Sequence, residues 1–284
     1  MSTLFVALVE KDICTGHDAC KSRIALEGSP DVFIDGKPVV RVGDRWEMHG
    51  CPAHPAHNGV VTQGSDEVSL NGMPVARIGD PLNCGSKVKT GTPAVYAGGK
   101  LSSITELNKK LPEMDEATRA KSEREAAAMK EEAQKHVELA KEMGAKTGTP
   151  PALWLGKASR ETNFGKALDS NGYGDRGNGF GMFQVDKRSH TPQGGPFSQA
   201  HYDQSAGIWN NQAAAVAKKH PDWSSDEQLK GTVASYNFGV KNVQTRPSDA
   251  ASWAQLDDGT AHDDYSRDVL GRAKWYADNL DWGD

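Results

Sequence analysis

Residues 27–44 read EGSPDVFIDGKPVVRVGD, and they align without gaps with residues 63–80, QGSDEVSLNGMPVARIGD. A truncated third copy, TGTPAVYAGG, occupies residues 90–99. In both full copies a short alternating stretch precedes Asp35-Gly36 or Asn71-Gly72, dipeptides that favour a tight turn between two strands. The pattern predicts one short β-hairpin per copy. A single hairpin is marginal in water, so we expect the copies to stack on one another.

Metal-binding residue types gather around the copies, and the rest of the chain has no cysteine. Imidazole nitrogen and thiolate sulfur are the usual zinc ligands, and four protein ligands make a closed, structural site. The alternative is that Cys14 and Cys20 are small core residues and that the histidines are solvated. Because the candidates recur at equivalent loops, we favour a metal site. The candidates are His17, His49, Cys51, His54, His57 and Cys84.

The repeated segments, with VAR at residues 75–77, resemble the PAAR-repeat family over about residues 12–99. The resemblance implies a small β cone on a trimeric β-helical spike protein, bound through the wide apolar base of the cone. Such tips belong to contractile injection machines, either a bacterial type VI secretion apparatus or a phage tail. The resemblance also implies one zinc ion held by three histidines and a cysteine. The expected ligands are His17, His49, His57 and Cys84, with His54 and Cys51 as close competitors.

The middle of the chain separates two regions of different composition. The length of the whole chain, 284 residues, agrees with two domains. We place these domains at residues 1–99 and 118–284, with a linker at 100–117. From about Thr118 the sequence is rich in helix formers and is expected to dock on the downstream domain through an apolar stripe. The predicted fold class is therefore a multidomain chain, in which a small β cone of repeated hairpins precedes a mostly α-helical domain. The stripe consists of Met129, Ala133, Val137, Ala140 and Met143.

Net charge and apolar runs bear on the partners of the protein and on its route through the cell. The net charge of −5 argues against nucleic acid as a partner, because phosphate-binding proteins carry a basic surplus. The first apolar run, residues 4–9, is shorter than the roughly 7 to 15 residues of a signal-peptide core or the about 20 of a membrane helix. We therefore expect a protein made in the cytoplasm that reaches any other compartment by a route other than general secretion.

A second candidate site centres on Glu161. A helix is predicted from about Pro151, with Trp154, Leu155 and Ala158 facing inward and Glu161 one turn after Ala158 on the same face. A carboxyl group held near an apolar interior resists ionisation, because desolvation disfavours the charged form. Such a group is a candidate proton donor at neutral pH.

The segment after this helix adds two carboxylates. Residues 171–190, NGYGDRGNGFGMFQVDKRSH, are too rich in glycine for a helix and are expected to form a hairpin or loop against the helix end. This would bring Asp175 and Asp186 near Glu161. Inverting glycoside hydrolysis uses one carboxylic acid to protonate the leaving oxygen and a second carboxylate to activate water.

The region from about 118 to 280 resembles goose-type lysozyme in three segments: residues 158–190, LKGTVASYNFGVKNV at 229–243, and GTAHDDYSRDVLGRAKWY at 259–276. The resemblance implies a domain that hydrolyses the β-1,4 bond between N-acetylmuramic acid and N-acetylglucosamine in peptidoglycan, with no catalytic cofactor. It places Glu161 on the general acid, and Asp175 and Asp186 on the residues that position or activate water. The implied sugar contacts are Gln184, His190, Tyr236, Asn237 and Tyr265.

Together the two resemblances predict a wall-cutting enzyme carried on a spike tip, delivered to the target periplasm or forming part of a virion tail. An immunity protein is an expected partner if the chain is an interbacterial toxin. Three alternatives remain. A lytic transglycosylase shares the helix glutamate but has no need of Asp175 and Asp186; the domain could be a non-catalytic wall-binding cap; or a mechanical phage tip could use the enzyme only to clear a local hole. For Tyr236 and Tyr265 the alternative is core packing, and His190 could be a solvated loop residue.

Overall fold

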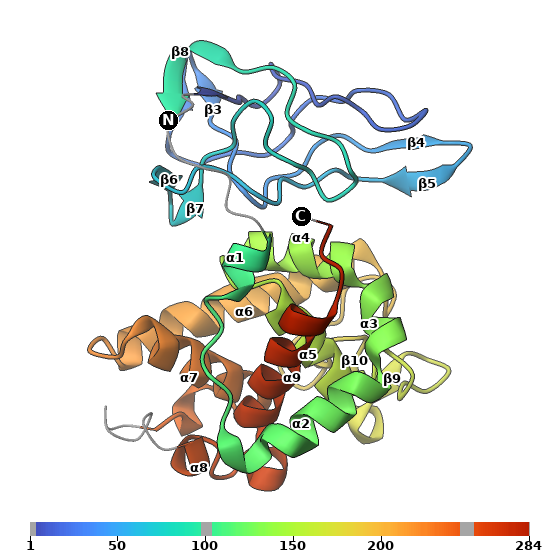
Figure 1. The fold of residues 1–284 in the computed structure, drawn as a ribbon, viewed down its shortest axis with the longest axis vertical. Coiled ribbons are helices and arrows are strands. Elements are labelled where there is room, and N and C mark those ends of the chain that lie inside the picture. The colour runs from blue at the N-terminus through green and yellow to red at the C-terminus, as the bar shows by residue number, and fades with distance from the viewer. Residues whose placement is uncertain (1–3, 98–103, 245–252, 284) are drawn as a thin grey trace. The chain divides into compact units, whose positions relative to one another are not determined.

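The computed structural model describes residues 4–97, 104–244 and 253–283 (Figure 1). The chain forms two compact units. One comprises Met1–Leu107, Glu138–Pro151 and Trp282–Asp284, and the other comprises Asn108–Val137 and Ala152–Asp281. The first unit contains short β-hairpins and the second is mostly α-helical, which confirms the predicted fold class.

Two hairpins of the first unit share one geometry because they come from the two full repeats. Both turns hold their central residues at positive φ, 51° and 74° at Asp35 and Gly36, and 54° and 76° at Asn71 and Gly72. Aspartate, asparagine and glycine tolerate this conformation, and the predicted turns are confirmed. The paired strands are β2 (Phe33–Ile34) with β3 (Lys37–Pro38), and β6 (Ser69–Leu70) with β7 (Met73–Pro74).

The truncated third copy is completed by the start of the chain. β8 (Thr92–Ala97) pairs antiparallel with β1 (Leu4–Val6). Leu4 lies opposite Ala97 in the same register as Lys37 opposite Ile34 in the first copy. The N-terminal strand thus supplies the half of the hairpin that the third copy lacks. This strand precedes residue 12, where the repeat was expected to begin.

A ring of backbone hydrogen bonds joins the three copies. The N–H of Ala7 donates to the carbonyl of Ala76 (3.0 Å), that of Val40 to Ala7 (3.0 Å), and that of Ala76 to Val40 (2.9 Å). All three residues are fully buried, and Trp46 and Val61 extend the same core. The expected stacking of the copies is therefore confirmed, with the N-terminal segment as the third member.

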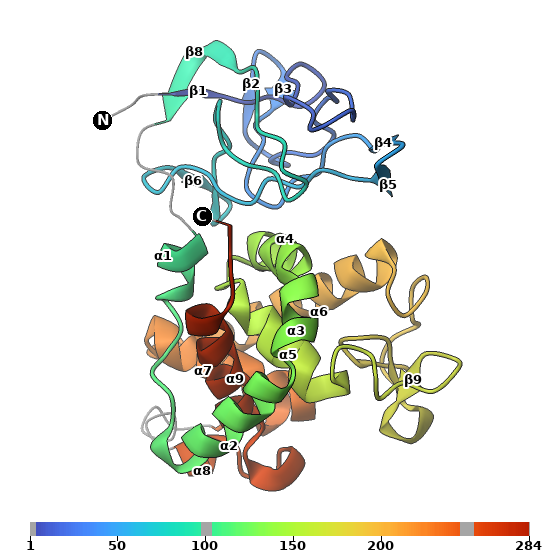
Figure 2. The ribbon, with the colours of Figure 1, turned by 45° about the vertical axis from the view of Figure 1, so that its right-hand side comes forward.

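One further hairpin stands apart from this ring. β4 (His49–Cys51) pairs with β5 (His54–His57), with an irregular register between His49 and Cys51. Both ribbon views place it at the end of its unit opposite the β1–β8 and β6–β7 pairs (Figures 1 and 2). It carries most of the crowded segment HGCPAHPAH.

Four helices follow the hairpin repeats: α1 (Ile104–Asn108), α2 (Glu116–Ala128), α3 (Lys130–Lys135) and α4 (Val137–Thr147). The predicted stripe is buried at Ala133, Val137, Ala140 and Met143. The helix itself is not continuous, because Met129 and His136 leave the helical conformation at φ −110° and −105°. None of the helices in the described part of the chain has the length and apolar character needed to cross a membrane.

The second unit is built around helix α9, which lies among α2, α5 and α7 (Figures 1 and 2). At Gly156 of α5 a Cβ atom would come within 2.4 Å of the carbonyl oxygen of Val269, so glycine allows α5 and α9 to pack backbone to backbone. Trp154, Leu155 and Ala158 are buried as predicted. The remaining helices are α5 (Ala152–Thr162), α6 (Gln199–Lys219), α7 (Ser225–Phe238), α8 (Trp253–Leu256) and α9 (Tyr265–Asn279), with single turns η1 (Asp175–Gly177), η2 (Val240–Asn242) and η4 (Ala261–Asp263).

A small sheet stands between α5 and α6 in the sequence. Its strands are β9 (Tyr173–Gly174), β10 (Gly179–Phe180) and β11 (Val185–Asp186), with β10 in the centre. The glycine-rich segment therefore forms a three-stranded antiparallel sheet. Gly174, Gly179 and Asp186 lie in one row across it.

Candidate functional site

Glu161 lies on the last turn of α5 and is half-buried. Its Oε1 accepts a hydrogen bond from the hydroxyl of Tyr265, the first residue of α9. Burial raises the pKa of the Glu161 carboxyl above its ordinary value, and the nearby charge of Asp175 adds to the rise. The hydrogen bond from Tyr265 and the charges of Lys157 and Arg160 oppose this rise without cancelling it. The carboxyl therefore keeps its proton to a higher pH than an exposed glutamate does.

Arg160 anchors the start of α9, where Tyr265 lies. Its guanidinium donates to Asp268 Oδ2 at 2.5 Å and to Asp264 Oδ1 at 2.9 Å. Arg272 and Ser122 also donate to the Asp268 carboxylate, at 3.0 and 2.8 Å. Because a buried carboxylate needs such partners, these bonds fix α9 against α5 and α2.

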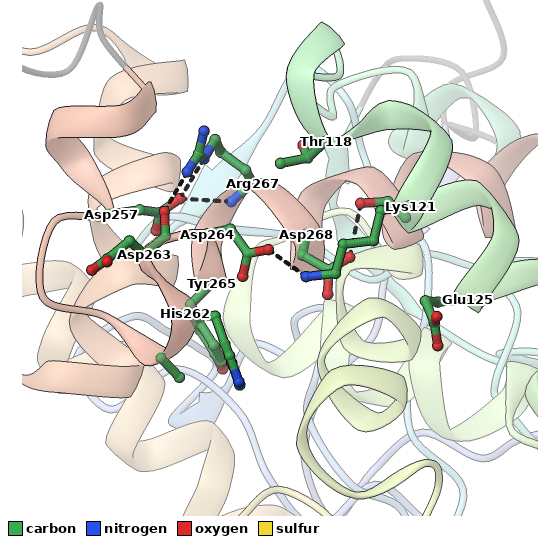
Figure 3. A network of polar contacts seen from close by, with 12 residues as sticks. Thr118, Lys121, Glu125, Asp257, His262, Asp263, Asp264, Tyr265, Arg267 and Asp268 are labelled. Carbon is green, nitrogen blue, oxygen red and sulfur yellow. Dashed lines mark hydrogen bonds and ion pairs between the residues drawn. The ribbon is translucent and has the colours of Figure 1, made fainter.

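The same polar network continues beyond Arg160. Figure 3 shows Lys121 of α2 directed at Asp264, and Arg267 directed at Asp257. Tyr265 lies between these two contacts in the sequence, next to Asp264. Polar contacts on both sides of Tyr265 in the sequence, at Asp264 and Arg267, therefore fix this residue, which bonds the Glu161 carboxyl.

The small sheet presents the two predicted aspartates. Asp175 follows β9 and is exposed, with a positive φ of 44°. Asp186 ends β11, and Arg188 donates to both of its carboxylate oxygens, at 2.8 to 3.1 Å. This pairing lowers the pKa of Asp186, so its carboxylate stays ionised at neutral pH. The row Gly174–Gly179–Asp186 brings both aspartates to the same end of the sheet.

Gln184 lies across one face of this sheet. Its Nε2 donates to the carbonyl of Gly181 at 3.0 Å. A Cβ atom at Gly174 or Gly179 would come within 2.5 or 2.3 Å of Gln184 Oε1. The glycines of β9 and β10 thus make room for this side chain.

The other predicted sugar contacts lie in different surroundings. His190 is exposed, and its backbone N–H donates to the carbonyl of Asp186 at 2.9 Å. Asn237 is exposed, and its Oδ1 accepts from the N–H of Ala261 at 2.9 Å. Tyr236 is half-buried and donates its hydroxyl to the carbonyl of Phe183 at 2.9 Å. Tyr265 is 2% exposed, with its hydroxyl on Glu161.

Three residues that support this site are not evident from the sequence pattern. Arg160 and Asp268 belong to the network above, which joins residues far apart in the chain. Lys157 precedes Glu161 by one helical turn and is fully buried. The four-residue spacing of Lys157 and Glu161 is visible in the sequence and was the signal available for it.

In the first unit, the four expected metal ligands lie together. One ligand atom from each of His17, His49, His57 and Cys84 lies within 4.8 Å of all the others. His49 and His57 face each other across the β4–β5 hairpin. Three nitrogens and one sulfur make a donor set suited to a closed tetrahedral metal site.

The imidazole rings are oriented for a cation. His49 Nδ1 donates to the carbonyl of Lys21 at 2.9 Å, and His57 Nδ1 donates to that of Pro55 at 2.8 Å. Each Nε2 therefore carries a lone pair, and the buried Nε2 of His49 has no hydrogen-bond partner among the described residues. His17 Nε2 lies 3.0 Å from His57 Nε2. The ring nitrogens of the three histidines thus meet beside Cys84, and the group fits a metal ion.

The two competing ligands lie outside this group. His54 Nε2 contacts Asp18 Oδ2 at 2.8 Å, and the side chain is 41% exposed. Cys51 pairs with His54 across the hairpin and is not one of the four clustered residues. Cys14 and Cys20 are buried, and Cys14 belongs to the core of the unit.

Comparison with known proteins agrees with both halves of this picture. The family model of lysozyme g matches residues 105–279. The chain belongs to the lysozyme g family. Lysozyme G of Dromaius novaehollandiae and lysozyme g of Struthio camelus are each 41% identical to it over 160 residues, which is 56% of this chain and 72% of those proteins. Lysozyme g of Gallus gallus is also 41% identical, over 56% of this chain and 70% of its own.

The lysozyme g domain is therefore a glycoside hydrolase that acts on peptidoglycan. A second family model, that of the PAAR motif, matches residues 53–103. The matched range contains β5, with His54 and His57, and the second repeat of the first unit. The lysozyme g family and the PAAR motif thus both occur in this one chain, as the two resemblances implied.

Proposed function

We propose that this chain is a spike-tip-borne muramidase, which hydrolyses the β-1,4 bond between N-acetylmuramic acid and N-acetylglucosamine. The observation that carries the proposal is Glu161, a half-buried carboxyl with a raised pKa, bonded to Tyr265 and coupled to Asp175. A group that remains protonated near neutral pH can give its proton to the oxygen of a glycosidic bond. The lysozyme g family supports the same reaction.

In this reaction Glu161 protonates the leaving oxygen as the C1–O bond breaks. Water attacks C1 from the other face of the sugar, and Asp175 or Asp186 takes its proton. Arg188 keeps Asp186 ionised, while the Asp175 carboxylate has no hydrogen-bond partner in the described part of the chain. Asp186 is therefore held as a carboxylate, and Asp175 is free to contact a water molecule.

We assign the sugar contacts by how exposed each candidate residue is. Gln184, His190 and Asn237 are half-buried or exposed, and we assign them to the sugars. We assign Tyr236, which is also half-buried, to the sugars with them. Tyr265 is buried and already bonded to Glu161, so we assign it to the acid rather than to the sugar.

The PAAR motif supports delivery by an injection machine, with a trimeric β-helical spike protein bound to the hairpin unit. We assign a structural zinc ion to His17, His49, His57 and Cys84. When bound, it would cross-link the loops of the unit and take no part in hydrolysis. The spike would carry the enzyme to the periplasm of a target cell, or the chain would form part of a phage tail. In the first case we expect an immunity protein that protects the producing cell.

Mass spectrometry of digested sacculi tests the reaction. Products with a reducing-end muramic acid are expected, with none from Glu161→Gln. Anhydro-muramic ends would identify a lytic transglycosylase, and wall binding without cleavage would identify a non-catalytic domain. Native mass spectrometry with the cognate spike tests delivery. One chain per spike trimer is expected, and no complex with a folded, zinc-loaded chain would contradict the tip assignment.

A further inference from the structure

Lys157 is a fully buried amine without a polar partner. It is 0% exposed, and its Nζ has no hydrogen bond or ion pair to any of the residues described. Burying an amine in this way costs free energy, because the water it loses is not replaced by an acceptor. A methionine of similar length would fill the same space without that cost. The lysine therefore has a role other than packing.

Aromatic rings surround the Lys157 amine. Nζ lies 3.1 Å from the ring centre of Tyr236, 4.2 Å from that of Trp154 and 4.8 Å from that of Trp209. Phe183 is farther away, at 5.9 Å. The faces of such rings attract a cation within about 6 Å. The surroundings thus offset part of the cost of burying the charge without neutralising it.

Lys157 lies one turn before Glu161 on α5, the spacing at which two helical side chains are neighbours. Burial lowers the pKa of Lys157 well below its ordinary value, and the charge of Glu161 opposes that change. The lysine charge in turn lowers the pKa of Glu161. The two groups are therefore electrostatically linked through the protein interior.

The other titratable groups around this pair do not replace Lys157. Tyr236 of α7 and Tyr265 of α9 have raised pKa values from burial and are neutral. Burial lowers the pKa of His201 of α6 to about 4, so this ring is neutral as well. Asp175 raises the pKa of Glu161 and so opposes Lys157, and Arg160 is engaged by Asp264 and Asp268. Lys157, in contrast, is a basic side chain one turn from Glu161 that no described carboxylate binds.

We propose that Lys157 is a positioning residue for the acid, whose caged ammonium stabilises the carboxylate that Glu161 becomes when it gives its proton to the glycosidic oxygen. Lys157 itself exchanges no proton and forms no bond in this step. The proton moves from Glu161 to the leaving oxygen, the C1–O bond breaks, and water supplies the new oxygen on C1. The inference rests on the proposed function of Glu161 as the acid.

Burial raises the pKa of Glu161 and Lys157 lowers it, and this balance explains why a residue that is costly to bury is useful. Burial and Asp175 make Glu161 a weak acid, which keeps its proton but donates it poorly. A cation on the preceding turn makes donation easier without putting a competing proton donor beside the sugar. A catalytic acid works best when its pKa lies near the working pH, and Lys157 brings Glu161 toward it.

The test is an NMR titration of the Glu161 side-chain carboxyl, ¹³C-labelled in the full chain and assigned by its loss in Glu161→Gln. In Lys157→Met the titration midpoint should rise by about one pH unit or more, since one unit corresponds to a modest charge interaction. Lys157→Arg keeps the charge and should stay near the wild-type midpoint. Lys166→Met removes an exposed lysine from the segment after α5 and should leave the midpoint unchanged.

The melting temperature separates this role from packing. Lys157→Met should melt at or above the wild-type temperature, while its kcat falls and the basic limb of its pH–rate profile moves up with the NMR midpoint. An unchanged midpoint in the folded Lys157→Met protein overturns the proposal, whether or not Lys157→Arg folds. Because the titration needs no turnover, it is independent of the proposed function, which would fail instead if Glu161→Gln kept its activity.

Discussion

Tyr265 donates its hydroxyl hydrogen to Glu161 Oε1 across 104 positions of sequence, and this bond joins the start of α9 to the end of α5. It is made inside the protein, since Tyr265 is buried. A hydrogen bond to a carboxylate favours its charged form, so Tyr265 makes Glu161 a stronger acid. The hydroxyl thus acts in the same direction as Lys157.

Removing this hydroxyl should weaken the acid. In Tyr265→Phe the pKa of Glu161 should rise by about one unit, because a hydrogen bond to a charged group contributes about 1.5–3 kcal/mol. The basic limb of kcat/KM should move to higher pH, and kcat should fall by roughly tenfold. The matched control is Tyr276→Phe, which removes a buried hydroxyl that bonds Ser159 instead. An equal shift of the limb in both variants would contradict the role of Tyr265.

Asp268 should be essential for stability. Asp268→Asn leaves Arg160 and Arg272 without their shared carboxylate, and loss of one member of a buried ion pair costs about 3–5 kcal/mol. We expect the free energy of unfolding, measured with denaturant at pH 7, to fall by this amount. Asp278→Asn, on the exposed side of the same helix, should cost little.

The pH dependence of this loss follows from the pKa of Asp268. Burial alone would raise it, but Arg272 and Arg160 outweigh burial and lower it below the ordinary value. The ionised carboxylate therefore stabilises the fold fully above the unfolded pKa of about 3.9, and this contribution disappears as the pH falls through the lower, folded value. The difference between wild type and Asp268→Asn should shrink below about pH 4. A difference that stays constant down to pH 2 would show that the charge is not its source.

The choice between His57 and His54 as metal ligand can be tested directly. His57→Ala should lower the bound zinc from about one ion per chain to near none and should lower the melting temperature of the first unit. His54→Ala should keep the metal, since its imidazole contacts Asp18. Metal content by mass spectrometry and melting with and without a chelator measure both effects. Zinc lost in His54→Ala but kept in His57→Ala would assign the ligands the other way.

The N-terminal segment should be part of the first unit rather than a free end. Ala7→Asp places a carboxylate at a fully buried position in the ring of backbone hydrogen bonds, where an unpaired charge is strongly unfavourable. The hairpin unit should unfold or lose its metal, while Ala53→Asp at the exposed tip of the β4–β5 hairpin should be tolerated. Circular dichroism and zinc content report the result. A stable, zinc-loaded Ala7→Asp protein would contradict the ring.

The features that could be predicted from the sequence are those that depend on residues close together in the chain. The turns at Asp35-Gly36 and Asn71-Gly72 follow from residues that accept positive φ, and the inward side of α5 follows from helical spacing. The completion of the third hairpin by β1 was not predictable in this way, because Leu4 and Ala97 pair although they lie far apart in the sequence.

The same distinction applies to the sites. The position of Glu161 near the interior could be predicted, but its bond to Tyr265 depends on how α5 and α9 pack. The spacing of Lys157 and Glu161 was visible, whereas the lack of a partner for the amine depends on rings from α6 and α7. Among the histidines, His57 lies in the metal group whereas His54 contacts Asp18, and the crowded sequence HGCPAHPAH does not show which of the two does so.

The central claim is that Glu161 supplies the proton that breaks the sugar bond. The most direct test is the turnover of purified sacculi by Glu161→Gln, compared with wild type at equal folded concentration. Glutamine keeps the size of the side chain but has no acidic proton, so the account predicts a loss of at least about 10³-fold in kcat with little change in wall binding or melting temperature. Turnover within tenfold of wild type would contradict it.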